Sequence, residues 1–407
     1  MSEYYAGKLK VVSAIMSKAG LYQKMTNPPC PPLEKGGSRH RQAHLPLFIV
    51  TAISFLEGTW HKRPCTCFVL FLAGWLLTIS GFVSPAWAEA PAPAAPQASA
   101  WSRPGPYEVA VMYYTWQDDR RRREVPVKIY YPAKGPGPFP LVIFSHGLGG
   151  SREGYQYLGR HWASHGYVSV HLQHLGSDSA IWEKNPSRLP AARRPASKLE
   201  NAVNRPLDVT FALDQLAMLN QSAGPLQGRL DLNRAGVAGH SFGAYTALAA
   251  AGQVFTGPGG REISLMEPRL KAAIPMSTPV PRKSPEYLSQ AYARVKVPCL
   301  HMTGTKDDSP VGETAAPDRR LPFDHLRGSD QYLITFQNGD HMMFSDFPCP
   351  FDRMAKDPRL HDLIRLASTA YWEAYLKGDA AARHWLAGGG LAQALAGKAA
   401  LEMKMKK

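Results

Sequence analysis

The sequence predicts an α/β fold with a mostly parallel central sheet and helices on both faces. Two observations support this prediction. Short apolar runs alternate with longer helical patterns through most of residues 105–385. Several of these runs are continuously apolar, as expected of strands that are buried on both faces of a parallel sheet. The predicted domain is also large enough to bury a full core.

The first part of the chain is expected to direct export rather than to fold. Residues 68–83 form an uncharged apolar run, with basic residues before it and small residues after it, including Ala88. This layout predicts a secretory signal peptide at residues 61–88, and therefore a periplasmic or secreted protein. An uncleaved membrane anchor is the alternative, although the run is short for a span. Residues 1–60 are expected to be a leader without a fold, which an over-extended gene start would explain.

The elements then follow in order after an Ala- and Pro-rich linker at residues 89–104. Two strands joined by a charged turn are expected to form an antiparallel edge, at residues 107–116 and 125–133. Further strands are expected at residues 139–147, 167–174, 235–241, 270–278, 297–304 and 332–339. Helices are expected at residues 152–165, about 200–220, 242–251 and 359–377. Pro206 fits the first turn of the second helix, and residues 386–407 are expected to form a basic tail.

Residues 176–200 interrupt this alternation. They are polar, basic and proline-containing, and they follow the end of a predicted strand. Loops at the carboxyl ends of strands line the ligand crevice of an α/β sheet. A substrate-facing lid and a solvated excursion are both open interpretations of this segment.

Composition narrows the possible partners. The chain of 407 residues carries a formal net charge of +15. It has no arginine-rich motif with interleaved aromatic residues, so no nucleic-acid partner is expected. The basic excess favours solubility or attraction to anionic surfaces, which leaves transient membrane contact open. Only Cys299 and Cys349 follow the signal peptide, and the sequence allows either a disulfide or two free thiols. No zinc pattern is present, so no metal is expected.

The motif GHSFG places Ser241 between Gly239 and Gly243, after a predicted strand and before a predicted helix. This is the context of a nucleophile elbow, a sharp turn that exposes a serine. The glycines allow strand and helix to approach closely. The amide of Phe242, at the helix N-terminus, is expected to face a developing oxyanion. His240 is expected to support packing, and a plain glycine-rich bend is the alternative for this motif alone.

The remaining parts of a catalytic site follow in the expected chain order. The motif FSHGLGG comes directly after a strand and offers the amide of Leu148 as a second oxyanion donor. Asp307 or Asp308, after a later strand, would orient a histidine, and we prefer Asp307. His341 follows the last strand and is the expected general base toward Ser241.

The order Ser241, Asp307, His341, with HGLGG upstream, resembles the α/β-hydrolase superfamily. The motifs FSHGLGG, GHSFGAYTA, HMMFSD, NRPLDVTFALDQL and AYWEAYLKGD are similar to those of the platelet-activating-factor acetylhydrolase group and of dienelactone-hydrolase-like proteins. The similarity covers roughly residues 105–385. It implies an α/β-hydrolase fold with an oxyanion hole formed by Leu148 and Phe242. True dienelactone hydrolases use a cysteine nucleophile, so the serine here favours ordinary ester hydrolysis.

The sequence therefore predicts an exported serine esterase that cleaves carboxylic esters through an acyl-enzyme. The substrate would be a small-molecule or lipid-like ester, and the resemblance implies a short acyl chain. No metal or organic cofactor is expected for this chemistry. A polyester, cutin-like or lipase-type hydrolase is the alternative activity. A non-catalytic binding protein on a hydrolase scaffold is the alternative of another class.

Overall fold

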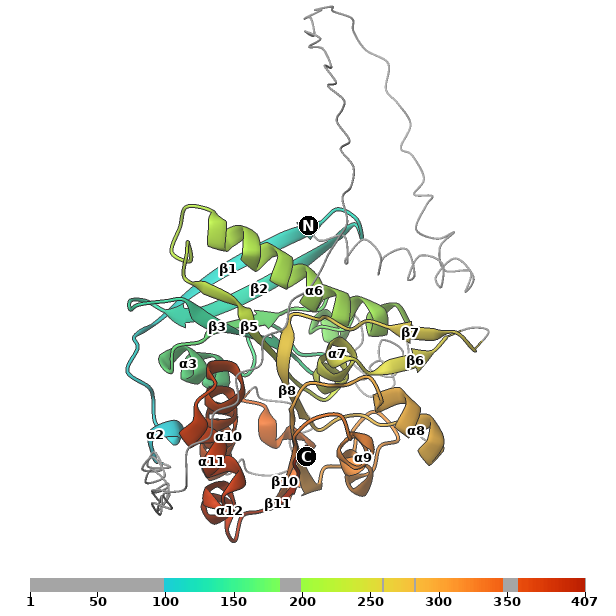
Figure 1. The fold of residues 1–407 in the computed structure, drawn as a ribbon. Coiled ribbons are helices and arrows are strands. Elements are labelled where there is room, and N and C mark those ends of the chain that lie inside the picture. The colour runs from blue at the N-terminus through green and yellow to red at the C-terminus, as the bar shows by residue number, and fades with distance from the viewer. Residues whose placement is uncertain (1–98, 184–198, 258–259, 282, 347–357, 407) are drawn as a thin grey trace, which may run out of the picture. The chain divides into compact units, whose positions relative to one another are not determined.

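The computed structural model describes residues 99–183, 199–257, 260–281, 283–346 and 358–406, which form the coloured ribbon of Figure 1. The predicted leader and signal peptide, most of the predicted linker, Cys349 and most of the interrupting segment lie outside these residues. Among the helices that the structure describes, none has both the length and the apolar character needed to cross a membrane.

A nine-stranded mixed sheet forms the centre of the described structure, in the order β1-β2-β4-β3-β5-β8-β9-β10-β11. The neighbours from β4 through β10 pair in parallel, whereas β1–β2, β2–β4 and β10–β11 pair antiparallel. The strands of the sheet are β1 (Val109–Asp118), β2 (Arg123–Pro132), β3 (Phe139–Ser145), β4 (Val168–Leu172), β5 (Leu230–His240), β8 (Leu270–Met276), β9 (Cys299–Lys306), β10 (Gln331–Asp340) and β11 (Ala399–Lys404). A separate hairpin consists of β6 (Val254–Thr256) and β7 (Glu262–Ser264). The predicted mostly parallel sheet with an antiparallel edge is confirmed.

Helical segments connect these strands and cover both faces of the sheet (Figure 1). The α-helices are α2 (Ser99–Ser102), α3 (Gln156–Ser164), α4 (Ala180–Glu183), α6 (Leu199–Gln221), α7 (Phe242–Ala251), α8 (Pro285–Tyr292), α9 (Leu321–His325), α10 (Pro358–Trp372), α11 (Ala380–Ala387) and α12 (Gly390–Leu395). Shorter 3₁₀ or π turns are η3 (Ala316–Arg320), η4 (His341–Phe344) and η5 (Glu373–Lys377).

Two hydrophobic clusters lie on opposite faces of the sheet. In β3, Leu141 and Ile143 belong to the cluster beneath α6, α7 and α8, whereas Val142 and Phe144 belong to the cluster beneath α3, α10 and η5. This division follows from the two-residue period of a strand, which points alternate side chains to opposite faces. Both sets are fully or almost fully buried, so the strand must be apolar along its whole length.

The two ends of the predicted domain differ from the structure. Residues 386–407 do not form the tail that we predicted, because α12 and β11 lie within them and β11 pairs with β10. The predicted linker also ends earlier than residue 104, because α2 begins at Ser99 and buries Trp101. The Trp101 ring packs edge-on against that of Trp385, with 4.9 Å between centroids. The domain therefore extends beyond residues 105–385 at both ends.

Helix α6 begins at Leu199, close to the predicted start, so Pro206 lies inside the helix and not in its first turn as we predicted. A proline has no N–H and cannot donate to the carbonyl four residues before it. Here that carbonyl belongs to Ala202, and it accepts a hydrogen bond from the Tyr245 hydroxyl at 3.3 Å. The interruption inside the helix is thus compensated by a side chain from α7.

Candidate active site

Ser241 lies on the sharp turn between β5 and α7, at the carboxyl end of the parallel strands. Its backbone has φ 55° and ψ −118°, a conformation that residues other than glycine rarely adopt. Its N–H donates to the Met276 carbonyl at the end of β8, at 2.8 Å. A Cβ on Gly239 would clash with the Gly243 carbonyl, and one on Gly243 would clash with the Ser145 carbonyl. Only glycine at both positions allows the strand and the helix to approach this closely.

Replacing Gly243 with alanine is expected to lower the free energy of unfolding by about 1–3 kcal/mol or more. The new methyl group would overlap backbone atoms of Ser145, and backbone cannot rotate away as a side chain can. Urea unfolding of Gly243→Ala beside Gly154→Ala measures the effect, because a Cβ on Gly154 would make only an ordinary contact at 3.8 Å. Equal stability of the two variants would contradict this account of the elbow.

The structure brings together the three residues predicted from the motif order. His341 lies in η4, directly after β10, and its Nε2 is 2.9 Å from Ser241 Oγ. Its Nδ1 is 2.7 Å from Asp307 Oδ1, in the loop after β9. Because the carboxylate accepts, the Nδ1–H donates to Asp307 and leaves Nε2 free to accept the Ser241 proton. These contacts form a continuous Ser–His–Asp hydrogen-bond chain.

The structure distinguishes the two candidate acids. Asp307 is fully buried, and its second oxygen, Oδ2, accepts hydrogen bonds from Ser277 Oγ at 2.6 Å and Thr303 Oγ1 at 2.7 Å. Asp308 is exposed, and its Oδ1 accepts from the Ala316 amide at 2.9 Å. Asp307 therefore ends the hydrogen-bond chain that starts at Ser241, whereas Asp308 holds the loop that leads to η3.

A buried arginine that the sequence analysis does not predict lies against this acid. Arg319, in η3, is 2% exposed. Its Nε donates to the Asp307 carbonyl at 3.0 Å and lies 3.4 Å from Asp307 Oδ1. Its Nη1 donates to the Ser277 carbonyl at 3.0 Å, and its Nη2 lies 3.2 Å from His341 Nδ1. The guanidinium therefore compensates a buried carboxylate that would otherwise be costly to ionise.

These contacts control the ionisation of Asp307. Burial raises its pKa, but the hydrogen bond and charge of His341, the charge of Arg319 and the hydrogen bond from Ser277 outweigh burial and lower the pKa to about 2. Asp307 is thus a carboxylate throughout the ordinary pH range.

Ionised Asp307 is expected to contribute roughly 2 kcal/mol to the free energy of unfolding, from a pKa lowered from 3.8 to about 2. Because the folded pKa is depressed, this contribution is present above pH 3.8 and is lost as pH falls through about 2. Urea unfolding of wild type and Asp307→Asn over this interval measures it. The stability of wild type relative to the variant should decrease as pH falls, and a constant difference would contradict the assignment.

His240, next to Ser241, supports the loop that carries His341. Its Nε2 donates to the His341 carbonyl at 2.8 Å, so its Nδ1 must accept from the Tyr155 hydroxyl, also at 2.8 Å. Burial and the neighbouring His341 hold the pKa of His240 well below its usual value, which keeps the ring neutral for both contacts. His240 therefore links Tyr155 to the segment that carries His341.

The two predicted oxyanion donors flank Ser241. Phe242 is the first residue of α7, and Leu148 lies in the loop after β3. A Cβ built on Gly147 would lie 3.5 Å from the Ser241 Cβ, so this loop passes directly beside the serine. Within the described part of the chain, the amides of Leu148 and Phe242 donate to no protein acceptor. In these residues, neither amide is therefore occupied by a protein acceptor, as an oxyanion donor requires.

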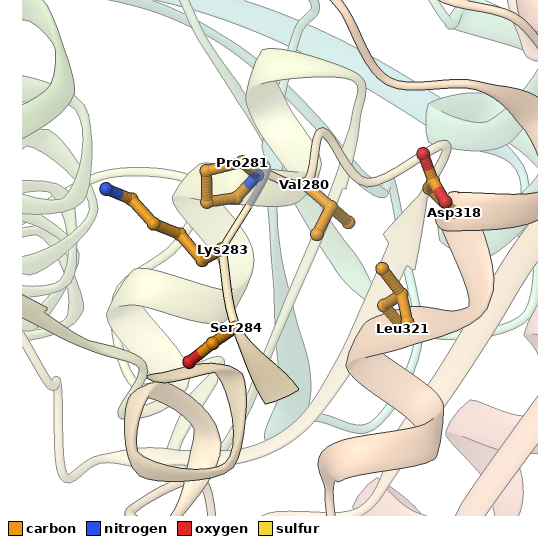
Figure 2. A pocket seen from close by; sticks show the side chains of 6 residues that line it. All are labelled: Val280, Pro281, Lys283, Ser284, Asp318 and Leu321. Atoms are coloured by element: carbon orange, nitrogen blue, oxygen red, sulfur yellow. The ribbon is translucent and has the colours of Figure 1, made fainter. Parts of the chain in front are cut away.

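A cavity of about 520 Å³ lies beside the segments that hold the acid (Figure 2). Val280 and Leu321 lie toward one another in Figure 2, whereas Lys283 extends away from them. The lining comes from the segment after β8, which carries Ser277, and from η3 and α9. Its members are Val280, Pro281, Lys283, Ser284, Asp318 and Leu321.

Of the five cysteines in the sequence, the structure describes only Cys299. Cys299, at the start of β9, is a buried free thiol whose pKa is raised to about 12 by burial. Cys349, with which the sequence allows either a disulfide or a second free thiol, lies outside the described residues. Among the residues that the structure describes, no group of three or more His, Cys, Asp or Glu side chains is placed to hold a metal ion.

Two family models match this chain. Residues 121–202 match the model described as platelet-activating factor acetylhydrolase, isoform II, and residues 192–348 match the model described as PET hydrolase-like. The first match contains the loop of Leu148, and the second contains Ser241, Asp307 and His341.

Curated relatives belong to the same two groups. The chain is 28% identical over 150 residues to the platelet-activating factor acetylhydrolase of Cavia porcellus, which is 31% of this chain and 34% of that protein. It is 27% identical over 190 residues to cutinase 1 of Thermobifida cellulosilytica and to a cutinase of Thermobifida fusca (strain YX). These alignments cover 46% of this chain and 56% and 48% of the two cutinases. The chain thus spans about a third to just over half the length of these relatives.

The strand order of the sheet, the sharp turn at Ser241 and the two family matches all indicate the same fold. The chain has an α/β-hydrolase fold, and it is similar to the platelet-activating factor acetylhydrolase and PET hydrolase-like families.

Proposed function

We propose that this protein is a serine hydrolase that cleaves carboxylic esters, with Ser241 as nucleophile, His341 as general base and acid, and Asp307 as the orienting carboxylate. The observation that carries this proposal is the hydrogen-bond chain from Ser241 Oγ through His341 to buried Asp307, at 2.9 and 2.7 Å. The elbow geometry and both family matches support it.

The reaction proceeds through an acyl-enzyme. His341 Nε2 takes the Ser241 proton as Oγ attacks the ester carbonyl carbon, and the amides of Leu148 and Phe242 stabilise the resulting oxyanion. The imidazolium, stabilised by Asp307, then gives its proton to the leaving alcohol oxygen. In the second half, His341 takes a proton from water, the hydroxide attacks the acyl carbon, and the acid product leaves as Ser241 recovers its proton. No step requires a metal or an organic cofactor.

We propose a short acyl chain as the preferred substrate, on the strength of the resemblance to the acetylhydrolases. A series of p-nitrophenyl esters from acetate to palmitate tests this with purified protein. The ratio kcat/KM should fall as the acyl chain lengthens. A rise with chain length would replace this proposal with a lipase-type one, and absence of turnover in a folded sample would favour a non-catalytic scaffold.

A polyester or cutin-like activity is the second candidate, because residues 192–348 match the PET hydrolase-like model and two Thermobifida cutinases are 27% identical to the chain over 190 residues. Release of soluble monomers from a polyester film, measured beside the ester series, separates the two. Film hydrolysis at a rate comparable to soluble-ester turnover would favour the second candidate.

Export to the periplasm or the medium is a further part of the proposal, supported by the basic, apolar and small-residue order of residues 61–88. Expression of the full chain in a bacterial host, followed by fractionation and sequencing of the mature N-terminus, tests it. Cleavage after Ala88 supports the proposal, whereas retention of the uncleaved chain in the membrane fraction supports an anchor.

A further inference from the structure

We propose that Arg205 is a positioning residue of the oxyanion hole, because it ties the loop that carries Leu148 to the helix that carries Phe242. Arg205 belongs to α6, so it lies outside both segments that it connects, and it is 1% exposed. The inference rests on the proposed function, since an oxyanion hole has a role only if Ser241 forms tetrahedral intermediates.

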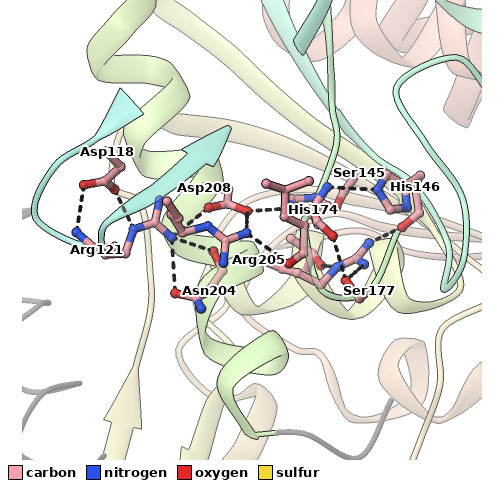
Figure 3. Close-up of polar contacts among 12 residues, drawn as sticks. Asp118, Arg121, Ser145, His146, His174, Ser177, Asn204, Arg205 and Asp208 are labelled. Carbon is pink, nitrogen blue, oxygen red and sulfur yellow. Dashed lines mark hydrogen bonds and ion pairs between the residues drawn. The ribbon is translucent and has the colours of Figure 1, made fainter. Parts of the chain in front are cut away.

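One end of the guanidinium holds the loop (Figure 3). Its Nη2 donates to the His146 carbonyl, two residues before Leu148. Its Nη1 donates to Ser177 Oγ at 2.8 Å, and the Ser177 carbonyl accepts from the Gly149 amide at 2.9 Å. Arg205 therefore holds the backbone before Leu148 directly, and it holds the backbone after Leu148 through Ser177.

The other side of the guanidinium holds α7. Arg205 Nε donates to Thr246 Oγ1 at 3.0 Å, and Thr246 Oγ1 donates to the Phe242 carbonyl at 2.9 Å. The guanidinium carbon also lies 4.4 Å from the centroid of the Phe242 ring. A planar guanidinium with five donors in fixed directions can set the spacing of two backbone segments in a way that a flexible ammonium cannot.

His146 reinforces the same loop. Its Nε2 accepts from the His174 amide at 3.0 Å, so its Nδ1 carries the proton that is donated to the Gly147 carbonyl at 2.6 Å. Burial and the nearby Arg205 charge hold the pKa of His146 well below its usual value, which keeps the ring neutral for both contacts. The loop is thus bound to the end of β4 as well as to α6.

A second Ser–His–Asp chain anchors the base of the loop (Figure 3). Ser145 Oγ donates to His174 Nε2 at 2.6 Å, and His174 Nδ1 donates to Asp208 Oδ2 at 2.8 Å. Asp208 lies about one helical turn after Arg205, and it forms ion pairs with Arg121 and Arg123 at 2.7 and 3.1 Å. Ser145, His174 and Asp208 are at most 1% exposed. This chain therefore anchors the loop and has no access to substrate.

Packing alone does not explain an arginine at this place. The direct hydrogen-bond acceptors of Arg205 are a carbonyl and two hydroxyls, all of them neutral. Burying this cation is costly even though the charge of nearby Asp208 offsets part of the cost, and an apolar side chain of similar length would fill the same space at a lower cost. What the guanidinium adds is three directed hydrogen bonds that join the two oxyanion donors.

The test compares two variants of the full chain, Arg205→Met and Arg269→Met. Arg269 also hydrogen-bonds to α6, through Asp214 Oδ1 at 2.8 Å and the Thr210 carbonyl at 3.1 Å, but it serves neither the loop nor α7. We expect Arg205→Met to lower kcat for a p-nitrophenyl ester by about 10- to 100-fold, since loss of one oxyanion donor costs about 100- to 1,000-fold. KM and the pH dependence of kcat/KM should stay unchanged, because Arg205 contacts no triad residue.

Arg269→Met should lower the thermal midpoint with kcat unchanged, and Arg205→Lys should recover part of the activity. Equal kcat for the two methionine variants, or a loss confined to KM, would overturn the inference while leaving the proposed function intact. If Arg205→Met does not fold, Arg205→Lys takes its place: a kcat loss beyond that of Arg269→Met supports the inference, and no such loss overturns it. An inactive wild type would overturn both proposals.

Discussion

Replacing Ser241 with alanine is expected to lower kcat for ester hydrolysis by about four to six orders of magnitude, the range seen when a triad nucleophile is removed. The substitution deletes the oxygen that lies 2.9 Å from His341 Nε2 and leaves the buried Asp307 contacts in place. Steady-state kinetics with p-nitrophenyl acetate measures the loss.

A matched control keeps this result specific. Ser177→Ala removes a hydroxyl that lies outside the triad, although it also tests the anchoring of the oxyanion loop. Its effect on kcat should be far smaller than that of Ser241→Ala. Comparable residual activity in Ser241→Ala and wild type, with both proteins folded, would contradict the assigned nucleophile.

Replacing Asp307 with asparagine is expected to lower kcat by about 10⁴-fold. An asparagine amide can donate to His341 Nδ1, which shifts the ring proton to Nε2 and prevents that nitrogen from accepting the Ser241 proton. The positive charge that forms on His341 during attack also loses its buried counter-ion. Steady-state kinetics of the variant beside wild type, with the same p-nitrophenyl ester, measures this loss.

Asp308→Asn is the matched control, because the two acids are adjacent in sequence but only Asp307 contacts His341. We expect Asp308→Asn to keep kcat close to the wild-type value. If Asp308→Asn lost as much activity as Asp307→Asn, the assignment of the triad acid would be wrong.

The sequence was informative where function depends on short motifs at strand ends. The elbow around Ser241 requires glycines on both sides, and these leave a local pattern that can be recognised without a structure. The chain order of serine, acid and histidine added to this, because parallel strands deliver their carboxyl ends to one edge of the sheet. The choice between Asp307 and Asp308 needed the structure, since burial and hydrogen bonding separate them and spacing does not.

The supporting arginines could not be predicted for the same reason. Arg319 and Arg320 are neighbours, yet one is buried against Asp307 and the other pairs with Asp324 and Glu402 nearer the surface. Arg205 could not be predicted either, because its hydrogen-bond partners lie in segments that are distant in the chain. No periodicity distinguishes a buried arginine from a solvated one when the partners are long-range.

The error at the C-terminus has a different cause. An edge strand is only half-buried, and exposed and half-buried positions are interspersed along β11. The resulting mixture of basic and apolar residues resembles the sequence of a tail. Lys404, counted there as part of a basic tail, donates to the carbonyls of Phe323 and Asp324 at 2.9 and 3.0 Å and so helps to hold β11 against α9. Charge composition alone does not reveal such a contact.

The most direct test of the account is reaction of the folded protein with a fluorophosphonate probe, followed by mass-spectrometric mapping of the modified residue. Such a probe phosphonylates an activated serine, whose oxygen displaces fluoride from phosphorus, and it leaves ordinary serines unmodified. We predict stoichiometric labelling at Ser241 that is abolished in Ser241→Ala and strongly slowed in Asp307→Asn. An unlabelled folded protein, or labelling at another serine, would contradict the claim that Ser241 is the nucleophile of an ester hydrolase.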